Sequence, residues 1–233
     1  HSIRRRQRQM CIRDRIQIIR SKEMVDLYFS FRSPYSYFIL PRIIDLKENK
    51  NININFKVVY PLAIREPEFF KGKNLFTYFL LKTFDYMRVK RRLNMEFNPP
   101  KPDPIKQNIL TGKISSHQPI IFEISHMGQE MSNRGFGLEF AYELSKKIWS
   151  EKNWNSDENI TKVLKEFDVD LDEIRKSIKV NEEALINQIK QNQKEQLEAG
   201  HHGVPLTVYK ETSFFGQDRF HDLVSLLKSD GMI

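Results

Sequence analysis

The sequence predicts an α/β fold in which a β-α-β unit and a β-β-α unit flank a long helical block. Short apolar runs that alternate or are rich in aromatic residues lie near both ends of the chain, whereas apolar residues at helical spacing fill the middle. With 233 residues, 39% of them hydrophobic and 29% charged, the composition is that of a globular protein. This length fits one large domain, or one domain that carries a large insertion.

The first unit occupies residues 25–60. Residues 25–31 (VDLYFSF) alternate and are rich in aromatic side chains, which predicts a buried strand. Ser33-Pro34 follows this strand, and residues 35–49 then place apolar residues at helical spacing. Residues 52–60 predict a second strand, which Pro61 ends. The unit has the length of a right-handed crossover between parallel strands.

Residues 67–199 are predicted to form an all-helical insertion. Its first helix is expected at Glu68–Leu93 and carries a phenylalanine-rich stripe from Phe69 to Phe84. We interpret this stripe as part of the core rather than as a cofactor site. The alternative is that it roofs an apolar substrate cavity.

Further helices are predicted after a rigid proline-rich connector at residues 98–104. The last of them is expected to bury Leu185, Ile189 and Leu197 on one face, with Gly200 as its C-cap. These helices are expected at Pro119–Met131, Gly135–Trp149, Asn155–Phe167, Leu171–Ile178 and Asn181–Ala199.

The chain returns to strand patterns after the insertion. Strands are predicted at residues 206–209 and 213–215, joined by a turn, and a helix at residues 217–228. Without the insertion, residues 24–66 and 200–233 have the β-α-β and β-β-α order of the thioredoxin fold. The predicted organisation is therefore a thioredoxin-like domain interrupted by a helical domain.

The single cysteine, Cys11, excludes an intrachain disulfide, a C-x-x-C redox pair and a cysteine zinc cluster. Since no run approaches ~18 consecutive apolar residues, the sequence also excludes a transmembrane helix. Four features are therefore excluded before any motif is considered.

The net charge of +8 is concentrated at the N-terminus. Residues 1–24 hold eight basic and two acidic side chains, against 30 and 28 in the rest of the chain. The run RRQRQMCIRD, Arg5–Asp14, resembles one reading frame of a transposon-type sequencing-library adapter. We therefore expect residues 1–23 to be a non-native tail, with Met24 as the true start. A basic targeting or RNA-binding arm is the alternative.

No apolar signal-peptide region follows these arginines. We accordingly expect a cytoplasmic protein that binds neither nucleic acid nor a membrane.

Ser33-Pro34-Tyr35-Ser36 lies where the first strand meets its helix. Thioredoxin-type oxidoreductases place a C-x-x-C here, because the helix N-terminus stabilises a thiolate. Both cysteine positions are serine in this chain, so the sulfur must come from another molecule. Glutathione, with its thiolate held by the Ser33 hydroxyl, is the expected supplier. The alternative is that Ser33 only caps the helix, with Pro34 at its first position.

Gly203-Val204-Pro205 immediately precedes the third predicted strand. A cis-proline at this point faces the active-site helix in thioredoxin folds, and the exposed backbone of Val204 can pair with a peptide-like ligand. The alternative is an ordinary proline that opens a strand.

The third candidate element, Phe215–Arg219, opens the last helix. Free N–H groups at a helix start hold a carboxylate, and Asp218 can accept a hydrogen bond from an ammonium group. Together they suit the γ-glutamyl end of glutathione, which carries both charges. The alternative is that Gln217 and Asp218 simply cap the helix.

These segments resemble the family of 2-hydroxychromene-2-carboxylate isomerases and kappa-class glutathione transferases, relatives of the DsbA-type oxidoreductases. The markers are SPYSY at Ser33–Tyr37, GVP at Gly203–Pro205 and FFGQDR at Phe214–Arg219, and the resemblance extends from about Val25 to Leu227. It implies that Ser33 is the catalytic residue that contacts the thiolate. It also implies that glutathione is the cofactor, bound by Val204, Pro205, Gln217 and Asp218.

The same resemblance places Tyr35, Ser36 and Asn108 at the substrate pocket. Relatives are often dimers, which makes a homodimer the oligomeric state to test. The chain departs from the family after the second strand, where well-studied members have an asparagine and a lysine that contact glutathione. Arg65-Glu66-Pro67-Glu68 and the following Lys71, Lys73 and Asn74 match neither residue, so the groups that hold the glycine end are not predicted.

The implied activity is that of a glutathione-dependent isomerase or transferase that acts on a small aromatic electrophile. A second hypothesis is a non-catalytic thioredoxin-fold binding protein that has lost both redox cysteines. His201-His202 is interpreted as a polar pair at a helix end, because no third metal ligand is spaced nearby.

Overall fold

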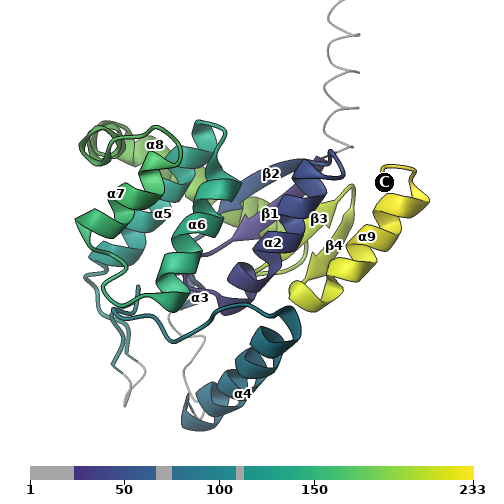
Figure 1. The fold of residues 1–233 in the computed structure, drawn as a ribbon, viewed down its shortest axis with the longest axis horizontal. Helices are drawn as coiled ribbons and strands as arrows, with labels where there is room; N and C mark the ends of the chain where they lie inside the picture. The colour runs from purple at the N-terminus through teal and green to yellow at the C-terminus, as the bar shows by residue number, and fades with distance from the viewer. Residues whose placement is uncertain (1–23, 67–74, 109–112) are drawn as a thin grey trace, which may run out of the picture.

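A computed structural model of the protein describes residues 24–66, 75–108 and 113–233 (Figure 1). Its four-stranded sheet has the order β2-β1-β3-β4. The parallel pair is β1 (Met24–Phe29) with β2 (Asn53–Val58), while β3 (Leu206–Tyr209) is antiparallel to both β1 and β4 (Thr212–Phe215). The predicted strands and α/β class are therefore confirmed. The predicted non-native tail lies outside the described residues.

Two helices from the thioredoxin-like unit pack on one face of the sheet. They are α2 (Pro34–Glu48), which connects β1 to β2, and α9 (Phe220–Ser229), which follows the short 3-10 helix η2 (Gln217–Arg219). Leu27 of β1 belongs to the same buried cluster as Phe38 of α2 and Leu223 of α9. Since side chains alternate along a strand, the neighbouring residues of β1 point to the opposite face.

The opposite face of the sheet contacts the long helix α8 (Leu171–Glu198). Lys57 of β2 lies 2.9 Å from Asp26 of β1 and 2.7 Å from Glu195 of α8. These two ion pairs join β1 and β2 to the last turn of α8. The end of α8, and the chain that follows it into β3, is thereby fixed against the sheet.

The insertion is helical, as predicted, and shares its core with the sheet. Phe97 stacks on Trp149 of α6 at 5.1 Å and contacts Phe38 of α2 at the same centroid distance. None of the helices in the described ranges has both the length and the hydrophobicity that crossing a bilayer requires. The other helices of the insertion are α4 (Leu75–Leu93), α5 (Pro119–Asn133), α6 (Gly137–Ser150) and α7 (Asp157–Lys165), and the short helix α3 (Leu62–Arg65) precedes the insertion.

The structure corrects two details of the last insertion helix. Residues 171–178 and 181–199 were expected as two helices, but α8 is continuous, because the Lys179-Val180-Asn181 junction contains no glycine or proline to break it. Leu197, expected on the buried face, is 55% exposed, and the neighbouring Gln196 is buried instead. Gly200 follows the helix with φ of +91°, as a helix-ending glycine should.

The interpretation of the phenylalanine-rich stripe as core is wrong for the part of it that the structure describes. Phe84 is 67% exposed, and Leu80, Leu81 and Met87 are exposed as well. The face of α4 that packs on the protein carries Val89, which is 3% exposed, and Tyr86. Both faces of this helix are apolar, so spacing could not identify the buried one. Phe69 and the predicted helix start at Glu68 lie outside the described residues.

Candidate functional site

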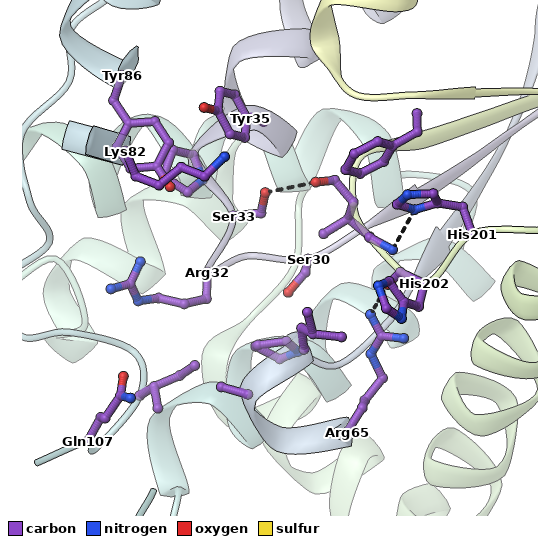
Figure 2. Close-up of a pocket in the computed structure, with 18 residues that line it drawn as sticks. Ser30, Arg32, Ser33, Tyr35, Arg65, Lys82, Tyr86, Gln107, His201 and His202 are labelled. Carbon is purple, nitrogen blue, oxygen red and sulfur yellow. Dashed lines mark hydrogen bonds between the residues drawn. The ribbon is translucent and has the colours of Figure 1, made fainter. Parts of the chain in front are cut away.

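A cavity of about 400 Å³ lies at the N-terminal end of α2 (Figure 2). The β1–α2 junction, α3, α4 and the segment before β3 contribute its walls. Apolar and aromatic groups form part of the lining, including Pro34, Tyr35, Tyr86, Val204 and Phe215. The polar part includes three cationic side chains, those of Arg32, Arg65 and Lys82, together with Ser33, His201 and His202.

Ser33 occupies the start of α2 and faces this cavity. Its Oγ accepts a hydrogen bond from the Ser36 backbone N–H at 3.2 Å, so Ser33 does cap the helix. The same hydroxyl donates to the Val204 carbonyl oxygen at 3.3 Å. The Val204-Pro205 peptide bond is cis, as predicted from the sequence. Capping and a place in the cavity are therefore compatible for this residue.

The segment opposite Ser33 is held by contacts on both sides. His201 Nδ1 accepts a hydrogen bond from the Gly203 N–H at 2.8 Å, and the imidazole stacks on Phe215 with centroids 3.7 Å apart. Gln196 of α8 donates to the Gly203 carbonyl at 2.7 Å. A Cβ at position 203 would lie 2.5 Å from the Phe215 ring, so only glycine fits beneath this stack. The Val204 carbonyl is thus presented from a rigid segment.

The two arginines of the cavity differ in their partners. Arg32 forms a two-pronged ion pair with Asp103, both N–O distances being 2.6 Å. Arg65 instead donates to two backbone carbonyls, those of Tyr60 and His202, each at 2.7 Å. Burial lowers the pKa of Arg65, which nevertheless remains charged at any physiological pH. Cationic groups beside aromatic walls suit a ligand with an anionic group and an apolar part.

Tyr35 is the one predicted substrate-pocket residue that lines the cavity. Its hydroxyl donates to a carboxylate oxygen of Asp85, and its ring contacts Tyr86 at a centroid distance of 5.1 Å. Burial, together with the hydrogen bond to Asp85, raises the pKa of Tyr35 above its usual range. The phenol therefore stays protonated and contributes an aromatic wall.

Ser36 and Asn108 lie elsewhere. The Ser36 side chain is fully buried and does not line the cavity. Asn108 lines a neighbouring hollow that shares Ala63, Ile105 and Gln107 with the cavity. Of the substrate-pocket residues predicted by resemblance, the structure thus places only Tyr35 in the lining of the cavity that Ser33 faces.

Gln217 and Asp218 also lie outside the cavity lining. Gln217 is fully buried, and its Oε1 accepts hydrogen bonds from Arg42 at 2.8 Å and from Arg92 at 3.3 Å. Asp218 is exposed and pairs with Arg92 of α4 at 2.8 Å. Neither side chain caps η2 or α9, so the capping alternative is wrong here. Pro205 is buried just behind Val204, and its carbonyl accepts the Gly216 N–H at 2.9 Å.

Sequence reasoning missed Arg32 and the two histidines as residues that line the cavity. Arg32 directly precedes Ser33, and His201-His202 directly precedes Gly203, so adjacency to the motifs was the available signal. The histidines do follow a helix end, as interpreted, yet both line the cavity. Among the described residues, no three His, Cys, Asp or Glu side chains are placed to hold a metal ion.

Comparisons with known proteins agree with this architecture. Residues 128–228 match the family model of the DSBA-like thioredoxin domain. No curated protein sequence matches the chain. The fold is a DsbA-like thioredoxin fold with a helical insertion, as the sequence predicted.

Among solved structures, the chain is similar to a 2-hydroxychromene-2-carboxylate isomerase, with a TM-score of 0.68, 16% identity, and coverage of 88% of this chain and 95% of that one. A "probable DsbA oxidoreductase" of Streptomyces coelicolor gives a TM-score of 0.59 at 12% identity, covering 89% and 90% of the two chains. The cytosolic disulfide reductase DsbM of Pseudomonas aeruginosa gives 0.55 at 9% identity, covering 89% and 98%. The predicted resemblance to this group is confirmed, and at these identities the likeness concerns the fold.

Proposed function

We propose that this protein is a glutathione-dependent isomerase of the 2-hydroxychromene-2-carboxylate isomerase type, or a kappa-like glutathione transferase, acting on a small aromatic electrophile. One observation carries the proposal. The Ser33 hydroxyl lies at the start of α2, 3.3 Å from the carbonyl before a cis-proline, in a cavity with cationic and aromatic walls. A structure of DsbM with glutathione adds support, since it pairs this fold with that ligand.

Ser33 would stabilise the glutathione thiolate. Its hydroxyl hydrogen points to the Val204 carbonyl in the free protein and would turn to the bound sulfur. The Ser36 N–H continues to donate to Ser33 Oγ, which makes the hydroxyl a better donor. The positive end of the α2 dipole adds to the stabilisation of the anion. Both effects lower the pKa of the bound thiol.

In the isomerase reaction, the thiolate adds to a conjugated carbon of the substrate. A carbon–sulfur bond forms while the π electrons move to the carbonyl oxygen, giving an enolate. Rotation occurs about the former double bond, and the enolate then expels the thiolate, so that glutathione is regenerated. In the transferase reaction, the enolate carbon takes up one proton, which balances the proton that the thiol released. The adduct then leaves as the product.

The γ-glutamyl end of glutathione carries an ammonium and a carboxylate. The Asp218–Arg92 pair is complementary to these two charges, with the ammonium on the aspartate and the carboxylate on the guanidinium. Val204 would pair with the cysteine backbone between this end and the glycine. A protein that depends on glutathione suits the reducing cytoplasm, where this thiol is maintained.

Titration of the protein with glutathione, followed by calorimetry and by thiolate absorbance near 240 nm, tests the proposal. We expect a dissociation constant in the millimolar range or below, and a pKa of the bound thiol below that of free glutathione. Catalysed insulin reduction should be absent, because exchange requires a protein thiolate to attack the disulfide, and residues 24–233 contain no cysteine. Absence of glutathione binding would refute the proposal.

The structure also holds an observation that favours a non-catalytic binding protein. Ser33 and Asp218, the groups assigned to glutathione, both have partners within the chain, namely the Val204 carbonyl and Arg92. If these contacts persist when a ligand binds, the cavity would bind an anion that has an apolar body and no thiol. Binding of an aromatic carboxylate such as benzoate, together with failure to bind glutathione, would favour this second function.

A further inference from the structure

Arg65 is placed to recognise an anion in the cavity. It is the last residue of α3, and its Nε and Nη2 donate to the carbonyls of Tyr60 and His202 at 2.7 Å each. A guanidinium has five N–H groups, so these two bonds fix its plane and leave other N–H groups for a ligand. Figure 2 shows Arg65 and Ser33 contributed to the same cavity by different elements.

Arg65 forms no direct salt bridge within the ranges that the structure describes, although the Glu66 carboxylate is close enough to act on its charge. The neighbouring Glu66 carboxylate pairs with His202 Nδ1 at 3.3 Å instead. Arg32, on another wall, is neutralised by Asp103. A partly buried cation that no carboxylate hydrogen-bonds directly carries a desolvation cost, and a ligand carboxylate bound to its remaining N–H groups would offset that cost. Arginine also matches a carboxylate with two parallel hydrogen bonds.

The segment from His202 to Pro205 indicates how a bound peptide would be oriented relative to Arg65. At one end, the His202 carbonyl accepts from Arg65 at 2.7 Å. At the other end, the Pro205 carbonyl accepts from Gly216, two residues before Asp218, at 2.9 Å. A tripeptide that pairs its central residue with Val204 therefore extends toward Asp218 on one side and toward Arg65 on the other.

We propose that Arg65 binds the glycyl carboxylate of glutathione and thereby makes the cavity selective for a thiol peptide with a free C-terminal carboxylate. This inference rests on the proposed function, since the central cysteine must lie between Ser33 and Val204. Arg65 takes a role for which the sequence offered no matching asparagine or lysine. It would act by binding the ligand and by orienting the sulfur, without contact to the reacting atoms.

The test compares glutathione with its glycyl monoethyl ester by calorimetry on the full chain. The ester keeps the thiol and the γ-glutamyl group but lacks the anion. We expect the wild type to prefer glutathione by about 10- to 150-fold, the range for a hydrogen-bonded charge pair. Arg65→Gln should abolish this preference. Arg65→Lys keeps the charge and should retain part of the preference.

Arg32→Gln is the matched control, because Arg32 lines the same cavity with its charge already paired. It should keep the preference for glutathione over the ester. If Arg65→Gln weakens both ligands equally, Arg65 merely joins α3 to the His202 carbonyl, and the inference is wrong. If Arg65→Gln fails to fold, a wild type that binds both ligands equally overturns the inference, and a preference that Arg65→Lys reduces supports it. A wild type that binds neither thiol refutes the proposed function itself.

Discussion

The two places where a strand leads into a helix of the thioredoxin-like unit make an instructive comparison. At the first, Ser33 caps α2 and faces the cavity at the same time. At the second, Gln217 and Asp218 neither cap a helix nor line the cavity, and both bind arginines instead. The sequence offered the same two interpretations, cap or ligand site, at each junction.

The difference arises from what packs against each junction. The first faces the Val204 carbonyl and open space. The second faces α4, which brings Arg92 to Asp218, and α2, which brings Arg42 to Gln217. A polar residue at a helix start is therefore a candidate binding group, and its neighbours in the tertiary structure decide whether it would meet a ligand inside the cavity or as one half of an ion pair outside it.

The first junction is tested by Ser33→Ala. The variant loses the hydroxyl but keeps the α2 dipole, so the pKa of the bound thiol should rise without reaching that of free glutathione. Turnover at neutral pH should fall by about 10²- to 10³-fold, the scale for one lost anion-stabilising donor. The measurement is thiolate absorbance near 240 nm against pH, with turnover. Identical titration curves for the wild type and Ser33→Ala would show that Ser33 acts only as a helix cap.

The second junction is tested by Asp218→Asn, which removes the charge but keeps the shape. We expect glutathione to bind about 1.5–3 kcal/mol more weakly, because a charge-assisted hydrogen bond to the ammonium is lost. Stability should change little, since Asp218 and Arg92 form an exposed pair. Calorimetry and thermal melting measure the two effects. Unchanged affinity with lowered stability would assign Asp218 to the fold alone.

Gln217→Ala sharpens the contrast between the neighbouring residues. Among its hydrogen bonds, Arg42 would keep only the 3.5 Å bond to the Phe38 carbonyl beside its cation–π contact with Phe220, and its buried Nε already has no hydrogen-bond partner. We expect the free energy of unfolding to fall by about 1–3 kcal/mol, the cost of leaving a buried polar group unsatisfied. Urea denaturation measures this change. A stability equal to that of the wild type would show that the Arg42 contact contributes nothing.

The smallest expected effect concerns pH. Burial, with the neighbouring His202, lowers the pKa of His201, and protonation of Nδ1 would break its bond to Gly203. As the pH falls, His201 is therefore protonated in the unfolded chain before it is protonated in the folded chain. The contribution of neutral His201 to the free energy of unfolding is present above about pH 6.5 and is lost as the pH falls below that value. The loss should stay below about 1.4 kcal/mol, because the ring is partly exposed.

His201→Asn keeps an acceptor for Gly203 without a titrating ring, so its melting temperature should fall less between pH 7.5 and 5.5. His221→Asn, at the second junction, is the matched control. An equally steep fall in His201→Asn and the wild type would show that His201 does not contribute.

The sequence by itself determined the order of strands and helices along the chain, the helical insertion, and the places of Ser33 and Pro205 where a helix and a strand begin. These features depend on local patterns, such as alternation in residues 25–31 and the serine and proline that start α2, which act over a few neighbouring residues. The thioredoxin-like topology followed from them, because few topologies can connect such elements, and the resemblance of three motifs to a known family added the relation to DsbA.

Only the tertiary structure decided the rest. The exposed face of α4, the pairing of Asp218 with Arg92 and the cavity position of Arg65 each depend on residues far apart in the chain. Spacing shows that a helix has an apolar face but does not show which neighbour covers it, and charge shows that arginines are present but does not show which of them meet a carboxylate. Those outcomes depend on how whole elements pack, since burial and ion pairing are properties of the assembled core.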